Sequence, residues 1–144
     1  MRVAIAADHA GFPHKDALVV HLGERGVTVL DLGPDNGETS VDYPDYAHLV
    51  AREVASGAAD FGVLVCGTGI GMAIAANKVA GIRAANVVTP EFAALSREHN
   101  DANVVTVSAR FTDLPTNVAI VDAFIDTPFG GGRHATRVDK IEPK

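Results

Sequence analysis

Residues 61–78 read FGVLVCGTGIGMAIAANK, and the fold is decided in this stretch. An apolar run at 61–66 passes into a loop with glycine at every second position, 67–71, and then into a second apolar segment. A continuous apolar run of this length, followed by a glycine loop and a helix, is typical of a strand buried on both faces of a parallel sheet. Cys66, the only cysteine of the chain, stands where this strand ends.

Four further apolar runs indicate four more strands of the same kind. They are RVAIAAD, VTVLDLG, IRAANVV and NVVTVS, at residues 2–8, 27–33, 82–88 and 103–108. Segments with helical spacing separate them, and Pro44, Pro90 and Pro115 each stand where a helix is expected to begin. A first helix is expected over about residues 13–24, ended by Gly26. The alternation predicts one open parallel sheet of five strands with helices on both faces.

The chain has 144 residues, 47% of them hydrophobic, so we expect one domain over residues 1–144. Residues 128–144, PFGGGRHATRVDKIEPK, combine glycines with a basic cluster and little apolar content. We expect this tail to run over the surface and onto a neighbouring subunit.

The formal net charge of −6 argues against a surface for nucleic acid or an anionic membrane. The first apolar run meets Asp8 too early for a signal peptide. The longest uncharged run, 61–77, carries four glycines and is too short to span a membrane. A cytoplasmic protein without a nucleic-acid or membrane partner is therefore expected.

The carboxyl ends of the first and third strands carry reactive side chains. In open parallel sheets, ligands bind beyond the carboxyl ends of strands where the direction of winding reverses. With the common strand order 2-1-3-4-5, that reversal lies between strands one and three. Asp8 and His9 follow the first strand and Cys66 ends the third, so they are expected to meet at one crevice. Asp8 could also merely cap its own loop.

The loop Gly67-Thr68-Gly69-Ile70-Gly71 suits an anion. Its glycines let backbone N–H groups turn inward, and the following helix N-terminus favours a phosphate or an oxyanion formed during a reaction. Met72 replaces the third glycine of the dinucleotide fingerprint, and no Walker-type ending follows. By itself, such a loop is equally compatible with a tight strand–helix turn.

Cys66 has two interpretations. Near a helix N-terminus and backbone donors the thiolate is favoured, and it could act as a nucleophile or as a base toward a C–H acid. A free cysteine is otherwise commonly a small buried hydrophobic residue. Position alone leaves both interpretations open.

Other polar residues also have a functional and a structural interpretation. His99, beside Asn100 near a helix end, could act on a ligand or only cap the helix. Arg133 and Arg137, four residues apart, could hold a phosphate or form a solvated basic tail. Tyr43 could reach a ligand or pack before its helix. The six histidines and the single cysteine show no metal-ligand spacing, so no metal is expected.

Five motifs follow one another over nearly the whole chain. They are DHAGF, DYPDYA, CGTGIGMAIAANKVAGIRAA, LSREHNDANV and GGRHATRVDKI, starting at residues 8, 42, 66, 95 and 131. Together they resemble the family of type B ribose-5-phosphate isomerase, which also includes the subunits of galactose-6-phosphate isomerase. The combination of CGTGIG with SREHND is the most specific part.

The resemblance implies a flavodoxin-like (Rossmann-like) fold and the isomerisation of aldose and ketose phosphates through an enediolate, without metal or cofactor. Cys66 would move the proton between C1 and C2, and Thr68 would donate to the substrate oxygens. The anion hole would come from the backbone of Gly67, Gly69 and Gly71, with Asn100.

The same resemblance implies the roles of the remaining residues. Asp8 and His99 would open the sugar ring, with Tyr43 nearby. The phosphate would be held by His9, Arg133 and Arg137, with His134 and Arg110 as further candidates. The family builds its site across a dimer interface, so His99, Asn100 and the tail arginines would come from the neighbouring chain of a homodimer or homotetramer.

The chain departs from the family pattern at three places. Many members have glycine at Ser108 and an acidic residue at Gly130, and residues 111–117, FTDLPTN, are unlike the usual segment. The leading function is the interconversion of ribose 5-phosphate and ribulose 5-phosphate. The alternatives are the same chemistry on erythrulose, allose or galactose phosphate, or a non-catalytic phosphate-binding module. Whether a non-identical partner subunit is needed stays open.

Overall fold

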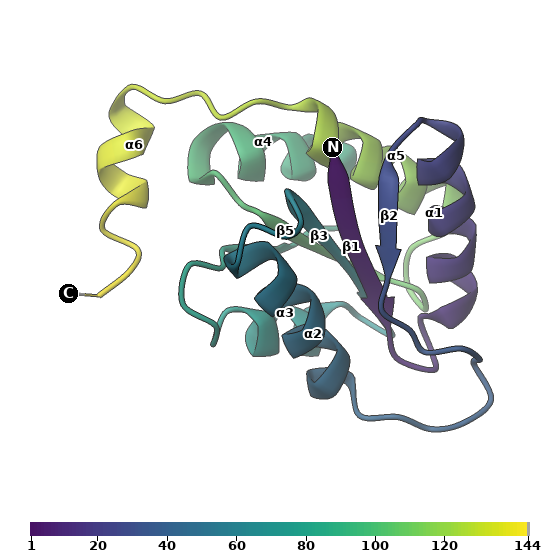
Figure 1. Cartoon of the computed structure of the whole chain (residues 1–144). Coiled ribbons are helices and arrows are strands. Elements are labelled where there is room, and N and C mark those ends of the chain that lie inside the picture. Colours follow the sequence, from purple (N-terminus) through teal and green to yellow (C-terminus); the bar gives the residue numbers. More distant parts are fainter. Residues whose placement is uncertain (144) are drawn as a thin grey trace.

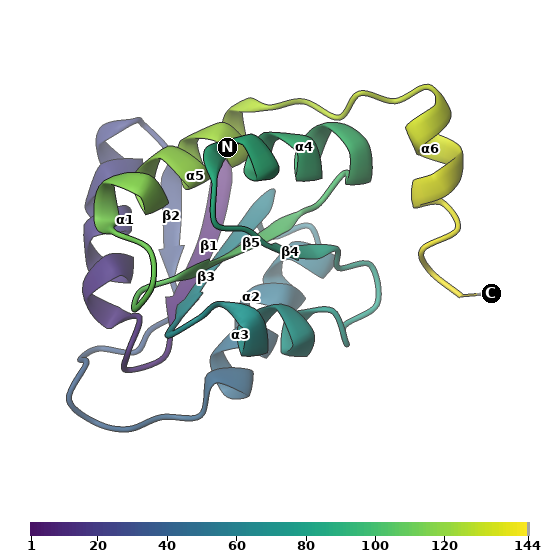
Figure 2. The same ribbon diagram turned by 180° about the vertical axis from the view of Figure 1, so that it is seen from behind.

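A computed structural model describes residues 1–143 and shows one parallel sheet between two layers of helices (Figures 1 and 2). The strands are β1 Arg2–Ala7, β2 Thr28–Asp31, β3 Phe61–Cys66, β4 Ala84–Asn86 and β5 Val104–Ser108. The helices are α1 Phe12–Glu24, α2 Tyr43–Ala55, α3 Ile70–Ala76, α4 Pro90–Asn100, α5 Leu114–Asp126 and α6 Arg133–Val138. Each strand lies within a predicted apolar run, and the predicted flavodoxin-like α/β class is confirmed.

Local sequence explains where the helices begin and end. Helices α2, α4 and α5 each carry a proline in the first turn, as predicted. The Thr89 side chain caps α4 by accepting the Phe92 N–H at 3.2 Å, and Asp113 caps α5 by accepting the Thr116 N–H at 2.9 Å. Helix α1 ends at Glu24, as expected.

The strand order is β2-β1-β3-β5-β4, so the expected order 2-1-3-4-5 is wrong at its last two positions. Strand β5 is buried along its whole length and pairs with both β3 and β4. Strand β4 has only three residues and ends in the exposed Asn86. The fully buried strand takes the inner position, because an edge strand leaves one side of its backbone unpaired.

The two helical layers cover opposite faces of the sheet (Figures 1 and 2). Helices α1, α4 and α5 share one core, in which Leu18 and Phe124 pack with Val65 of the sheet. Helices α2 and α3 share the other core, in which Val50 and Met72 pack with Leu64. Successive residues of β3 therefore enter different cores, as expected for a strand buried on both faces.

The central strand β3 occupies a special position in this arrangement. It lies between β1 and β5, and both of these strands are followed by helices on the face opposite to α3. The connection that leaves β1 and the connection that leaves β3 therefore run in opposite directions, so the expected reversal between these two strands is present. Because ligands bind at such reversals, Cys66 stands where this fold offers a site.

Helix α6 lies at the margin of the molecule, beyond the end of α4 (Figures 1 and 2). None of its residues is buried. The Gly130 N–H donates to the Glu98 carbonyl at 2.9 Å, the His134 ring stacks on His99 at 4.5 Å, and Glu142 accepts the Gly81 N–H at 2.8 Å. The tail is thus attached through a few polar and stacking contacts, and its expected contact with another subunit stays a prediction.

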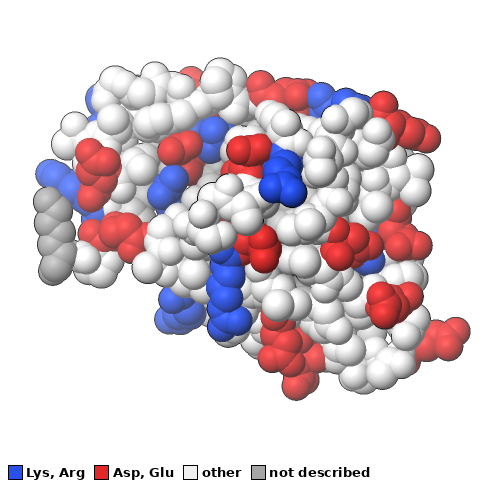
Figure 3. All heavy atoms as spheres, in the orientation of Figure 1, with Lys and Arg blue, Asp and Glu red and all other residues white. Residues whose placement is uncertain are grey.

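The surface agrees with the acidic composition. On the face shown in Figure 3, acidic side chains are spread widely and basic side chains lie among them without a continuous basic region. Over residues 1–143, no helix is both long and apolar enough to cross a membrane.

Candidate active site

Cys66 ends β3 and is 5% exposed. The Gly69 N–H donates to its Sγ atom at 3.1 Å. A backbone donor directed at sulfur stabilises negative charge there, which a thiol acting only as a small apolar residue does not need. This contact favours the chemical interpretation of Cys66 over the structural one.

The glycine loop after Cys66 is tightly constrained. Gly69 has φ +81°, and a Cβ there would lie 2.5 Å from Asn86 Oδ1. The Tyr43 ring covers Gly71 so closely that a Cβ at Gly71 would lie 2.7 Å from ring atoms. Tyr43 therefore borders the loop, and its expected place near the ring-opening residues stays a prediction. Both glycines are required by contacts with other parts of the chain.

The end of β1 lies directly beside this loop. The Asp8 N–H donates to the Val65 carbonyl at 3.1 Å, and the buried Asp8 carboxylate accepts the Gly11 N–H at 2.9 Å. His9 Nδ1 accepts the Val41 N–H at 3.2 Å, so the ring carries a proton on Nε2. Asp8 thus caps its loop, as the structural interpretation held, and it also lies at the same edge of the sheet as Cys66.

Arg110 completes this first group of residues. A Cβ on Gly67 would lie 3.3 Å from Arg110 Cδ and 3.4 Å from Nη1, so the arginine side chain lies over the loop. Within residues 1–143, no carboxylate lies within 4.0 Å of its guanidinium group. Arg110 is therefore a cation available to an anion at the loop.

A second group of predicted residues lies elsewhere in the same chain. His99 and Asn100 end α4, and Arg133, His134 and Arg137 belong to α6. Helix α4 runs from the carboxyl end of β4 back to the amino end of β5, so its last turn lies at the opposite edge of the sheet from Cys66. With a rise of about 3.3 Å per residue, β3 alone separates the two edges by roughly 15–20 Å. One chain does not bring the two groups together.

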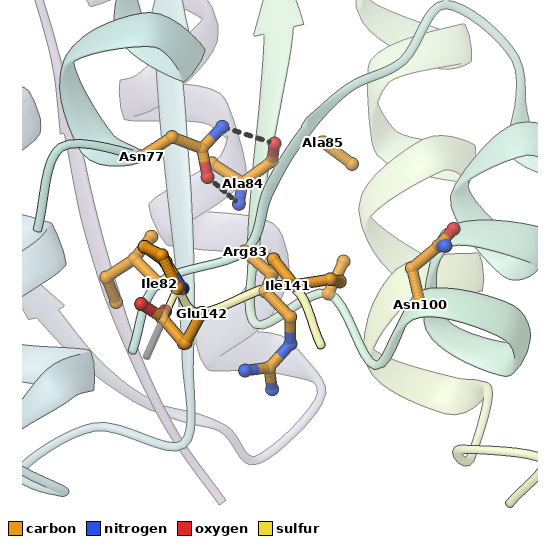
Figure 4. Close-up of a pocket in the computed structure, with 10 residues that line it drawn as sticks. Asn77, Ile82, Arg83, Ala84, Ala85, Asn100, Ile141 and Glu142 are labelled. Atoms are coloured by element: carbon orange, nitrogen blue, oxygen red, sulfur yellow. Dashed lines mark hydrogen bonds between the residues drawn. The ribbon is translucent and has the colours of Figure 1, made fainter. Parts of the chain in front are cut away.

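The members of the second group contact one another. The His99 and His134 rings stack with 15° between their planes. The pKa of His134 is lowered, mainly by desolvation and to a smaller extent by the nearby His99, Arg133 and Arg137. The neutral form of the ring is therefore favoured. A cavity of about 470 Å³ adjoins this region; Asn100, Arg83 and the tail residue Ile141 line it, and Cys66 does not (Figure 4).

Two hydroxyl residues contact the loop without having been predicted to do so: Thr106 was not named from the sequence, and Ser108 was named only as a departure from the family pattern. Thr106 and Ser108 of β5 both donate to carbonyl groups of the glycine loop. The available signal was the pattern VVTVS, in which two polar residues alternate with valines in a strand predicted to be buried on both faces.

No group of three or more potential metal ligands occurs within residues 1–143. The expected absence of metal and cofactor stays a prediction.

Fold and geometry together define an α/β enzyme with a thiol, a carboxylate and a glycine loop at the carboxyl edge of a parallel sheet. Residues 3–141 match the model of the Ribose/Galactose Isomerase family, and the chain belongs to this family. The resemblance stated from the sequence is confirmed, and the protein is an isomerase.

Individual relatives cover almost the whole chain. Ribose-5-phosphate isomerase B of Escherichia coli (strain K12) is 49% identical over 140 residues, which span 97% of this chain and 93% of the relative. The solved structure of Clostridium thermocellum ribose-5-phosphate isomerase B is similar with a TM-score of 0.96 and 48% identity, covering 98% of this chain and 95% of that one. The Mycoplasma genitalium enzyme, solved with bound ribulose-5-phosphate, gives a TM-score of 0.94 and 46% identity, covering 97% and 93%.

Proposed function

We propose that this protein interconverts ribose 5-phosphate and ribulose 5-phosphate by ring opening and proton transfer through an enediolate. The observation that carries the proposal is the thiol of Cys66, which ends β3 and accepts a backbone hydrogen bond from Gly69 at 3.1 Å, with Asp8 following the end of the neighbouring strand β1. Relatives of nearly full length that are named for this reaction support the choice of substrate.

The chemistry follows from the placement of these groups. The Cys66 thiolate removes the proton from C2 of the open-chain aldose, and the C–H electrons form the C1–C2 double bond of the enediolate. Thr68 and the loop backbone stabilise the negative charge that develops on oxygen. The proton of the C2 hydroxyl then passes to O1, and the thiol returns its own proton to C1, so that the carbonyl group is left at C2. Asp8 and His99 act on the ring oxygen and the anomeric hydroxyl in the preceding ring opening.

A second copy of the chain completes the site in this proposal. His99, Asn100, Arg133 and Arg137 lie at the sheet edge opposite to Cys66, so they serve the site only from a neighbouring chain. Apolar side chains that a partner could cover support this: Ile70 and Ile74 of α3 and Phe92 of α4 are 53%, 59% and 60% exposed. A homodimer, alone or within a homotetramer, is the assembly we propose.

Two alternatives differ in testable ways. The first is the same chemistry on a four-carbon or six-carbon sugar phosphate, for which the same reacting groups would serve. A phosphate-binding module without catalysis needs no base, and the donor directed at Cys66 Sγ favours the enzyme.

The direct test is the rate of isomerisation of ribose 5-phosphate by purified protein with a chelator present. A kcat/KM of about 10⁴ M⁻¹s⁻¹ or more is expected. Erythrulose, allose and galactose phosphates, assayed beside it, are expected to react more slowly. A higher rate with one of these would move the proposal to that sugar, and loss of activity in chelator would contradict the metal-free reaction.

Replacing Arg133 by alanine is expected to raise KM for ribose 5-phosphate by about 10- to 100-fold with little change in kcat. The reason is the loss of charge-assisted hydrogen bonds to the phosphate, each contributing about 1.5–3 kcal/mol. Steady-state kinetics measures the effect, with Lys140→Ala as a control that removes another exposed cation of the tail. A KM within twofold of the unchanged protein would exclude Arg133 from the phosphate site.

A further inference from the structure

We infer that Thr106 and Ser108 are positioning residues that hold the glycine loop in its catalytic conformation. The inference rests on the proposed function, because it assigns the loop backbone to stabilisation of the enediolate. Neither residue contacts the substrate in this interpretation; both act through the loop.

The two hydroxyl groups bind alternate carbonyls of the loop. Thr106 Oγ1 donates to the Gly69 carbonyl at 2.8 Å, and Ser108 Oγ donates to the Gly67 carbonyl at 2.6 Å. The two side chains lie two residues apart on β5 and therefore point to the same face of the sheet. They are 0% and 2% exposed. Strand β5 thus presents a pair of buried donors spaced to match two alternate residues of the loop.

Orientation of the carbonyls determines orientation of the N–H groups. In a planar trans peptide the C=O and the following N–H point in opposite directions. With the Gly67 and Gly69 carbonyls held toward β5, the N–H groups of Thr68 and Ile70 point away from β5. The order β1-β3-β5 places Asp8 and His9 on that side.

One of these two N–H groups is available for a substrate. The Ile70 N–H donates to Thr68 Oγ1 at 3.1 Å. The Thr68 N–H has no acceptor among residues 1–143. This N–H group is a backbone donor close to Cys66 in the chain and is directed away from β5. An oxyanion that forms at this edge of the sheet needs such a donor.

The Ser108 hydroxyl is itself fixed, because Ser108 Oγ accepts the Phe111 N–H at 3.0 Å while it donates to the Gly67 carbonyl. A loop with three glycines in five residues has large conformational freedom, which these contacts restrict. Because a displacement of about 1 Å at reacting groups can cost about 10²-fold in rate, restriction of this loop bears directly on turnover.

The test compares Thr106→Val, Ser108→Ala and the double variant with the unchanged protein in the ribose 5-phosphate assay. We expect kcat to fall about tenfold in each single variant and about a hundredfold in the double variant, with KM within twofold. Thr106→Ser keeps the hydroxyl and is expected to restore kcat. Ser96→Ala is the matched control: Ser96 is also buried and donates to a carbonyl, that of Ala93 at 2.7 Å, but within α4.

A second measurement separates positioning from general damage. Inhibition by inorganic phosphate should be unchanged in the variants, whereas an aldonohydroxamate phosphate that mimics the enediolate should lose affinity in parallel with kcat. The inference would be overturned if the Thr106 and Ser108 variants lost affinity equally for both inhibitors. It would also be overturned if their kcat were no lower than that of Ser96→Ala. If thermal melting shows that Thr106→Val does not fold, the same measurements on Ser108→Ala, at the end of β5, test the inference. If the unchanged protein does not turn over ribose 5-phosphate, the proposed function itself is refuted, and not only this inference.

Discussion

Cys66→Ser is expected to lower kcat for ribose 5-phosphate by about 10³- to 10⁴-fold, the upper part of the range that a positioned acid–base group contributes. Serine preserves the size of the side chain and can still accept the Gly69 N–H that now donates to Sγ. Its hydroxyl does not ionise near neutral pH, however, so no anion is available to remove the C2 proton. The fold should be unaffected, since Cys66 lies at the end of β3 and forms no disulfide.

Two measurements identify the missing step. Exchange of the C2 hydrogen with deuterated solvent should fall in parallel with kcat, while binding of ribulose 5-phosphate, measured by calorimetry, should change little. Turnover within tenfold of the unchanged protein would exclude Cys66 as the base. Loss of binding together with loss of turnover would assign it to substrate binding instead.

Gly69→Ala is expected to lower kcat/KM by about 10²-fold and to destabilise the protein. An L-residue in the left-handed region costs about 1–2 kcal/mol. At Gly69 the added Cβ would also lie 2.5 Å from Asn86 Oδ1 and 3.1 Å from the Val107 carbonyl, so the loop must move. Movement of the loop withdraws its N–H groups from Cys66 Sγ and from the substrate.

Gly57→Ala is a closely matched control for this variant. Gly57 has φ +80°, against +81° at Gly69, but a Cβ there would meet no atom within 4 Å. It should therefore lose only the conformational contribution in chemical unfolding, with kcat/KM unchanged. If Gly69→Ala behaves in the same way in both measurements, the close contacts of the loop do not matter for catalysis.

The strands and helix starts could be predicted because their signals are local. A strand buried on both faces appears as a continuous apolar run, and a proline in the first turn marks a helix start whatever the rest of the chain does. The order of the last two strands could not be predicted in this way. IRAANVV and NVVTVS are both short runs rich in apolar residues, and which of them pairs with β3 is decided by contacts across the sheet, from Gly62 with Val104 to Cys66 with Ser108.

In the candidate site, too, residues with local signals could be predicted, and residues whose partners are distant in the sequence could not. Asp8, His9 and Cys66 could be placed together from the sequence, because carboxyl ends of parallel strands share one edge. Thr106 and Ser108 could not, since their partners Gly69 and Gly67 lie 37 and 41 residues away. A polar residue in a buried strand indicates that a partner exists, but the partner's identity depends on the register between β3 and β5.

The attachment of α6 has a consequence for how such a protein diverges. None of the residues of this helix is buried, whereas Cys66 adjoins strands in which most side chains are fully enclosed. Substitutions in α6 therefore carry little stability cost, and those beside Cys66 carry a large one. If Arg133 and Arg137 hold the phosphate as proposed, the cations of the site can change during evolution while the reacting groups stay fixed, so a new sugar preference can arise without loss of the chemistry.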